Sequence, residues 1–177
     1  YDMVSEPRWV GLDNYRTLLV DPIFRQAMLN TLLYIVGSTA LITVVGLALA
    51  LAIHTGIPGA RACMTTMFLT NLMPIIAVCL VWRFLLHPYG LVNQMLSVLG
   101  VGRIDWLTSE YTALPAITVV TVWRFAPYFM VVFLAALLAL PADYYEAAEL
   151  DGAGPVRRFI HVTLPLLAPT IFFAVSY

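Results

Sequence analysis

Residues 146–154 read EAAELDGAG, and the chain continues through Phe159 to Leu164, Pro165 and Leu166. Most of this stretch is polar or small, and it stands between two long apolar runs of the sequence. A polar segment with helix-breaking glycines cannot remain in hydrocarbon, where every backbone group needs an internal partner. The stretch is therefore predicted to lie at a membrane surface, where a membrane protein can present a shaped surface to a soluble partner.

The residue types around this stretch also predict its local structure. Asp143 and Glu146 stand three residues apart, as in a variant of the capping box at a helix start. Residues 144–150 then form about two helical turns, and Gly152 can take the positive φ of a helix C-terminus. Pro155 suits the first turn of a second helix. The prediction is a short helix, a sharp reversal, and a helix that leads back into the membrane.

The composition indicates a membrane protein. The chain is 62% apolar and 11% charged, whereas soluble domains carry about 25% charged residues. Lipid is therefore the expected surrounding. The nine basic residues are all arginines and are scattered, apart from one adjacent pair, and the net charge is −1. Because the sequence has no run of basic residues that could bind along a phosphate backbone, nucleic acid is not an expected partner.

Four uncharged or nearly uncharged runs are long enough to cross a hydrocarbon core of about 30 Å. We expect an all-α, polytopic membrane fold with a single domain over residues 1–177. Asp21 before Pro22 is typical of a helix N-cap followed by a first-turn proline. The expected parts are an outer segment 1–30, spans near 31–53, 62–84, 112–140 and 160–177, and a loop 141–159.

The 141–159 loop resembles the EAA loop of ABC importer permeases, in which a short helix docks into the ATPase subunit. The match covers Glu146, Ala147, Ala148, Asp151, Gly152, Ala153, Phe159, Leu164, Pro165 and Pro169 in order and spacing. The resemblance implies that Glu146, Ala147, Ala148, Asp151, Gly152, Ala153 and Phe159 couple the chain to an ATPase. Weaker similarities at residues 10–15, 82–93 and 123–124 favour the sugar and glycerol-3-phosphate branch. A surface loop with good helix ends and no partner is the alternative.

The resemblance implies a type I ABC importer transmembrane domain, here a fragment of a six-helix core, in the bacterial inner membrane. ATPase subunits would hold ATP and Mg²⁺, so neither a cofactor nor a metal is expected in this chain, which is not an enzyme. The other implied partners are a second permease, usually a different chain, and an extracytoplasmic solute-binding protein. The 54–61 turn and the 141–159 loop would face the cytoplasm. The chain begins at Tyr1 and ends in an apolar run, which we interpret as part of a longer subunit.

The candidates for the solute pathway are Asn71, Trp123, Arg124 and Tyr128. An arginine within a span is costly to bury, so Arg124 is expected to face protein or a water-filled cavity. Its alternative roles are snorkelling at a helix end or a hydrogen bond to a neighbouring helix. Asn71 can instead be polar glue between helices, and both aromatic rings can simply pack against neighbours.

Two other classes of membrane protein compete with this interpretation. An ion-coupled carrier usually needs ionisable residues at membrane depth, but all ten acidic residues lie outside the expected spans. A membrane-embedded metal enzyme would need convergent ligands, and His54, His87 and His161 lie at different span ends. The sequence contains no Gly-rich phosphate loop, so ATP hydrolysis is expected to belong to another chain.

Overall fold

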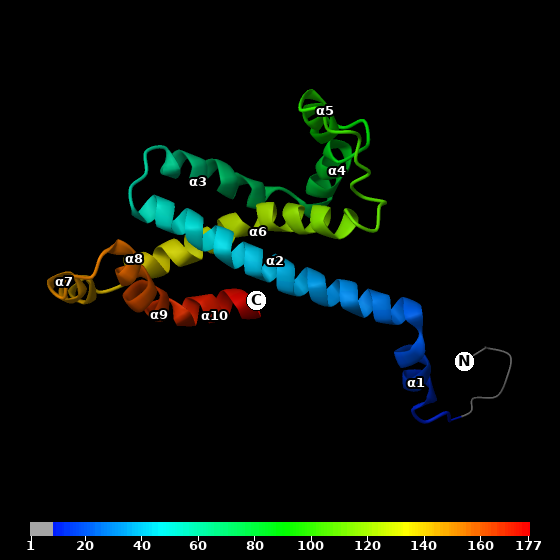
Figure 1. The fold of residues 1–177 in the computed structure, drawn as a ribbon, viewed down its shortest axis with the longest axis horizontal. Coiled ribbons are helices and arrows are strands. Elements are labelled where there is room, and N and C mark those ends of the chain that lie inside the picture. Colours follow the sequence, from blue (N-terminus) through cyan, green and yellow to red (C-terminus); the bar gives the residue numbers. More distant parts are fainter. Residues whose placement is uncertain (1–8) are drawn as a thin grey trace. The chain divides into compact units, whose positions relative to one another are not determined.

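The computed structural model describes residues 9–177, and all regular secondary structure in that range is helical (Figure 1). The chain divides into two compact units, residues 1–36 and 37–177, which are described separately. The elements are α1 (Asp13–Val20), α2 (Pro22–His54), α3 (Ala60–Leu69), the 3₁₀ turn η1 (Thr70–Leu72), α4 (Ile75–Leu85), α5 (Leu91–Val98), α6 (Ala113–Leu138), α7 (Ala142–Leu150), α8 (Pro155–Arg158), the π-helical turn η2 (Phe159–Thr163), α9 (Leu164–Leu166) and α10 (Ala168–Ser176).

Helix α2 begins where the sequence predicts a helix start. The backbone N–H of Ile23 donates to Asp21 Oδ1 at 2.8 Å, which confirms the Asp21 cap. The helix then runs without a break for 33 residues. The outer segment 1–30 and the span 31–53 were expected to divide at residue 31, but the helix continues through that position. The reason is that neither a further proline nor a glycine with positive φ intervenes before Gly56, whose φ is +74°.

Two helices, α2 and α6, are each long and apolar enough to cross a membrane, and two bent helix pairs bring the possible total to four spans in the described part. The expected span 62–84 is not one straight helix. Residues 64–72 and 75–85 are bent by 112°. Pro74 lacks an N–H and pushes the residue before it out of helical conformation, and Met73 is indeed extended at φ −76° and ψ 135°.

The expected span 160–177 also differs from a straight helix. Helical backbone begins at Pro155 and continues through the π-helical turn, so the loop and the last span share one helical segment. That segment is bent by 61° between Leu166 and Ala168. Pro169 lies in the first turn of α10, where its missing N–H leaves the preceding turn one hydrogen bond short.

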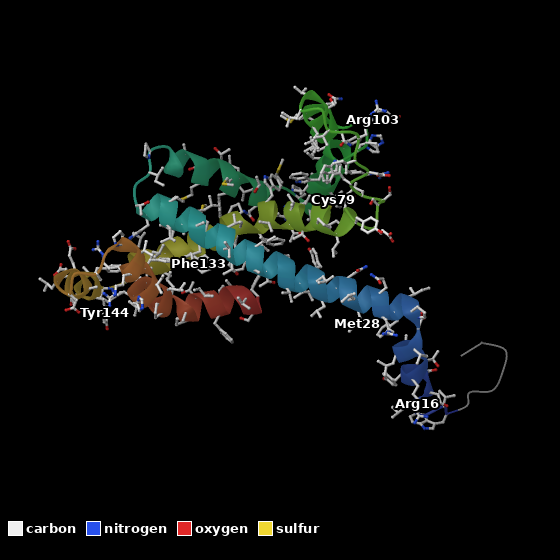
Figure 2. All side chains as sticks on the ribbon, viewed as in Figure 1. Arg16, Met28, Cys79, Arg103, Phe133 and Tyr144 are labelled. Carbon is white, nitrogen blue, oxygen red and sulfur yellow. The ribbon has the colours of Figure 1, made fainter. Side chains whose placement is uncertain are left out.

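The core of the 37–177 unit is formed by the second half of α2 together with α6 and α10. Phe133, labelled in Figure 2, is fully buried there with Met130 and Leu167. Gly46 marks the closest approach, because an added Cβ would lie 3.2 Å from Phe129 Cβ and 3.3 Å from Ala126 O and Met130 N. The small residues of the first long span therefore serve close helix contact at Gly46 and at the buried Ala50, as the sequence predicts.

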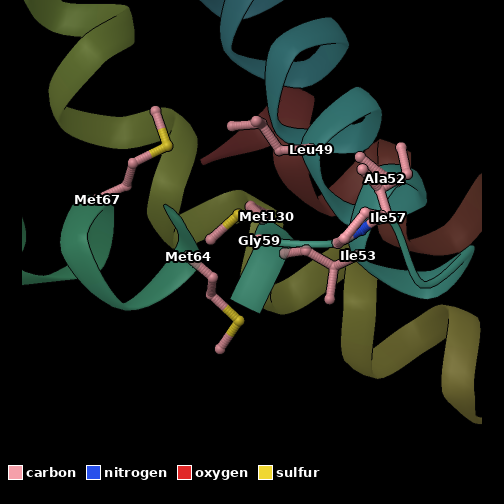
Figure 3. Close-up of a pocket in the computed structure, with 9 residues that line it drawn as sticks. Leu49, Ala52, Ile53, Ile57, Gly59, Met64, Met67 and Met130 are labelled. Carbon is pink, nitrogen blue, oxygen red and sulfur yellow. The ribbon is translucent and has the colours of Figure 1, made fainter. Parts of the chain in front are cut away.

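An apolar pocket of about 380 Å³ lies between the end of α2, the start of α3 and α6 (Figure 3). Methionines supply much of its wall, together with Leu49 and Ile57. Met64 and Met67 come from α3 and Met130 from α6. Flexible thioether side chains can fill such a space in more than one way.

Helices α2 and α6 run in the same direction within the 37–177 unit (Figure 1). The turn after α2 and helix α7 therefore lie at one end of this unit, and the segment that carries α5 lies toward the other. The fold thus places the 54–61 turn and the 141–159 loop on the same side, as the sequence predicts.

Candidate functional site

The reversal element, defined as residues 141–163, contains α7, a tight turn and the start of the returning helix. Gly152 has φ +72°. Its N–H donates to Glu149 O at 2.9 Å, and the N–H of Ala153 donates to Ala148 O, also at 2.9 Å. This bond pair is the Schellman ending of a helix, which turns the chain sharply and satisfies two end carbonyls. The predicted reversal at Gly152 is confirmed, as is Pro155 in the first turn of the second helix.

The predicted capping box at the start of this helix is wrong. Helix α7 already begins at Ala142, its N-cap residue is Pro141, and no side chain caps it. Asp143 is consequently within the first helical turn rather than before it. There its negative charge still interacts favourably with the positive end of the helix dipole.

Two side-chain contacts tie α7 to the returning helix. The hydroxyl groups of Tyr145 and Thr163 are 3.0 Å apart, and Thr163 is buried. Arg158 Nη1 donates to Glu149 Oε2 at 3.1 Å. Because the Glu149 side chain is 73% exposed, this ion pair contributes at most about 1 kcal/mol. Sequence reasoning missed both contacts, since they join residues 18 and 9 positions apart with no motif to link them.

The seven residues that the resemblance assigns to ATPase coupling differ in how exposed they are in this element. Glu146, Ala147, Asp151 and Gly152 are exposed, whereas Ala148, Ala153 and Phe159 are half-buried. None of the arginine and histidine side chains that the structure describes forms an ion pair with Glu146.

The same element exposes large apolar side chains that the sequence analysis did not single out. Leu150 is 90% exposed and Val156 is 71% exposed, on either side of the turn. Tyr144, labelled in Figure 2, is also more than half exposed. The part of the element around the turn therefore presents a mixed anionic and apolar surface.

A second polar site lies at the 112° break between η1 and α4. Arg124 Nη1, from α6, donates to Met73 O at 3.3 Å. Asn71 lies in η1, which contacts α6, and its Nδ2 is buried with no hydrogen-bond partner in the described part of the chain. The bond from Arg124 matches the expected alternative of a hydrogen bond to a neighbouring helix, while the Asn71 amide remains unsatisfied.

The two aromatic candidates pack against other rings. Trp123 meets Trp82 edge to face, with ring centroids 5.3 Å apart. Tyr128 stacks on Tyr177 at 6.1 Å and meets Phe129 edge to face at 5.2 Å. Both therefore take up the packing role that the sequence analysis gave as the alternative, although Tyr128 remains 37% exposed.

Metal-binding groups do not converge in the part of the chain that the structure describes. Among the side chains that the structure describes, no three His, Cys, Asp or Glu groups lie close enough together to hold an ion.

Comparison with known proteins places these features in a family. Residues 42–177 match the model of the family described as "Binding-protein-dependent transport system inner membrane component". A probable ABC transporter permease protein, YesP of Bacillus subtilis, is 32% identical over 98% of this chain. The trehalose/maltose transport system permease protein MalF of Thermococcus litoralis is 34% identical over 97%. The sn-glycerol-3-phosphate transport system permease protein UgpA of Escherichia coli is 34% identical over 94%.

A solved structure has the same fold. It is a bacterial ABC transporter that imports the acidic polysaccharide alginate, and one of its chains is 30% identical, with a TM-score of 0.81 over 94% of this chain and 59% of that one. The chain spans 57% of YesP, 58% of MalF and 56% of UgpA. The chain therefore belongs to the family of inner membrane components of binding-protein-dependent transport systems.

Proposed function

We propose that the chain is a multi-pass permease subunit of an ATP-driven importer in the bacterial inner membrane, and that it forms part of the path of a sugar or glycerol-phosphate type solute. ATP and Mg²⁺ belong to separate ATPase subunits. A second permease of different sequence completes the pathway, and an extracytoplasmic binding protein delivers the solute. The names of the relatives, which include trehalose/maltose, diacetylchitobiose and glycerol-3-phosphate systems, support this class of solute.

The geometry of the reversal element is the observation that carries the proposal. Its tip exposes Glu146, Leu150 and Val156 to solvent. Behind the tip, the Schellman turn and the Tyr145–Thr163 contact fix α7 to the helix that returns to the core. A partner that grips the tip can therefore move the returning helix as one body. This is what coupling of ATP hydrolysis to alternating access requires.

The solute pathway is proposed to include the helix break. A break at membrane depth leaves backbone carbonyls and polar side chains without helical partners, and transport proteins use such breaks as binding sites. Asn71 offers an unsatisfied amide there, and Arg124 carries a charge at membrane depth that no acid of residues 9–177 pairs with. We infer that these two side chains contact the solute, with Trp123 and Tyr128 forming the aromatic surroundings.

The coupling assignment is tested in the full-length importer, with its ATPase and second permease, reconstituted into vesicles. Glu146→Lys reverses a charge at the tip, and Gly152→Val strains the turn. We expect uptake to fall about tenfold or more, equivalent to about 1.4 kcal/mol of lost coupling, while the subunit still inserts and ATP is still hydrolysed. Glu110→Lys, outside the element, is the control. Normal uptake by both variants would remove the coupling role from the element.

The pathway assignment has its own test. Asn71→Leu and Arg124→Gln are expected to raise the KM for uptake while solute-independent ATP hydrolysis stays unchanged. Asn30→Leu, at an exposed position in α2, is the control. Unchanged KM values for both pathway variants would leave Asn71 and Arg124 with a purely structural role. Uptake driven by an ion gradient without ATP would instead favour the ion-coupled carrier.

A further inference from the structure

The segment between α4 and α6 is organised around one buried side chain. Asn93 is 4% exposed. Its Nδ2 donates to the carbonyl oxygens of His87, Pro88 and Ile104 at 3.3, 3.2 and 2.8 Å. Its Oδ1 accepts from Ile104 N and Trp106 Nε1, both at 3.2 Å. One amide therefore fixes α5 to the irregular residues 104–106 that follow it, so the segment has a defined surface.

A polar pocket of about 210 Å³ opens beside Asn93. Its wall contains Gln94 and Ser97 of α5 together with Tyr89 and Arg103. Arg103, labelled in Figure 2, holds its guanidinium carbon 4.6 Å above the centre of the Tyr89 ring. Within residues 9–177 no carboxylate pairs with Arg103. The ring thus holds the cation in place while its N–H groups stay available.

An exposed apolar stripe runs along α5 next to this pocket. Leu91, Met95 and Val98 recur at helical spacing and are 53%, 65% and 85% exposed. Gln94 and Ser97 occupy the neighbouring stripe, which faces the pocket. Helix α5 has 8 residues and spans about 12 Å, so it cannot cross a hydrocarbon core of about 30 Å. A short helix with one apolar and one polar stripe lies along a membrane surface instead.

The surroundings of α5 continue the apolar surface. Helix α4 contacts α5 and forms part of one of the bent pairs long enough to cross a membrane. Its Phe84 is 74% exposed, and Leu80 and Val81 are about half exposed. Lipid that covers α4 therefore extends directly onto the apolar stripe of α5, and the pocket then lies at the level of the phospholipid headgroups.

We propose that this pocket binds the phosphate of an anionic phospholipid, whose acyl chains cover the Leu91–Met95–Val98 stripe. The planar guanidinium of Arg103 can donate two parallel hydrogen bonds to phosphate oxygens. An acidic side chain of a soluble partner would satisfy the charge but would leave the apolar stripe uncovered. The lipid satisfies both features at once. This site is separate from the reversal element, so its test is independent of ATPase coupling.

The proposal is tested by native mass spectrometry of the full-length subunit, released from nanodiscs that contain equal amounts of phosphatidylglycerol and phosphatidylcholine. The wild-type protein is expected to retain phosphatidylglycerol preferentially. Arg103→Gln is expected to weaken this retention about tenfold, as loss of a charge-assisted bond worth about 1.5 kcal/mol would do. Arg16→Gln removes the same charge from an exposed arginine of α1 and should have no effect.

A second variant separates a lipid from a free anion. Val98→Glu leaves Arg103 intact but places a charge in the apolar stripe, and it is expected to lower retention of phosphatidylglycerol as well. Inorganic phosphate should not displace the lipid at concentrations where the lipid is retained. Retention unchanged by Arg103→Gln would overturn the proposal, as would full retention by Val98→Glu. Weakened docking of the solute-binding protein by Arg103→Gln, with lipid retention unchanged, would assign the pocket to that protein and equally overturn it.

Discussion

Tyr144 and Tyr145 are neighbours on α7 with different surroundings. The Tyr145 hydroxyl contacts buried Thr163, whereas Tyr144 is 54% exposed and makes no hydrogen bond through its side chain to the described residues. Tyr145→Phe should therefore destabilise the packing of α7 against the returning helix by about 1 kcal/mol. Hydrogen exchange of residues 142–163 in the full-length protein would show faster opening. Tyr144→Phe is the control. Equal exchange rates in the two variants would mean that the Tyr145–Thr163 contact does not stabilise the reversal element.

Gly152 and Gly154 differ in backbone conformation although only one residue separates them. Gly152 has φ +72°, which L side chains rarely adopt, and Gly154 is extended at φ −67° and ψ 169°. No described atom within 4 Å would meet an added Cβ at either position. Gly152→Ala should therefore cost about 1–2 kcal/mol from the backbone alone, and Gly154→Ala about zero. The amide of Ala153, which closes the Schellman turn, reports the difference by hydrogen exchange. Equal protection of this amide in the two variants would contradict the account of the turn.

At the scale of elements, the packing of α2 on α6 depends on Gly46. An added Cβ there meets backbone atoms of α6 at 3.3 Å, and backbone cannot move aside as a flexible side chain can. Gly46→Leu should destabilise the 37–177 unit by about 1–3 kcal/mol. The thermal stability of the purified protein in detergent measures this. Gly37→Leu, where no described atom lies within 4 Å of the added Cβ, should be neutral. A similar loss in both variants would point to a general effect of bulk in α2.

The segment around α5 depends on Asn93 in the same way. Asn93→Ala would remove the hydrogen bonds of the buried amide to the half-buried Ile104 and Trp106 groups, each worth about 1 kcal/mol, so limited proteolysis between residues 86 and 112 should become faster. Gln94→Ala removes an exposed amide that donates to Tyr89 O and should leave the rate unchanged. If both variants were cleaved at the wild-type rate, the segment would not depend on the buried amide.

The elements that the sequence predicts correctly are those set by nearest neighbours along the chain. Asp21 before Pro22 and Gly152 after α7 act within one turn of themselves, so their roles could be inferred from local chemistry. Asn71 and Pro74 interrupt the second apolar run in the sequence, but the 112° angle of the break could not be predicted, because hydropathy measures length and not direction. The partners of Tyr145 and Asn93 lie up to 18 residues away, and no period in the sequence relates them.

At the scale of the whole molecule, the reversal element, the broken helix and the α5 segment are three separate polar features of the fold. The reversal element lies at one end of the 37–177 unit and the α5 segment toward the other. The broken helix, which carries Asn71, precedes α5 in the sequence, whereas Arg124 lies on α6, between α5 and the reversal element. The proposed coupling residues lie on one short motif, so the sequence alone is enough to single them out. Contacts of Arg124 and Trp123 depend on how helices pack, which the sequence alone does not specify.

The most direct test of the coupling role is a contact measurement in the assembled, full-length importer. A photo-reactive amino acid replaces Leu150, which is 90% exposed at the tip of the reversal element. The matched control position is Val98, 85% exposed on α5. Ultraviolet crosslinking followed by mass spectrometry should give an adduct with the ATPase subunit from position 150 and none from position 98. No ATPase adduct from position 150, or equal adducts from both positions, would contradict the coupling role.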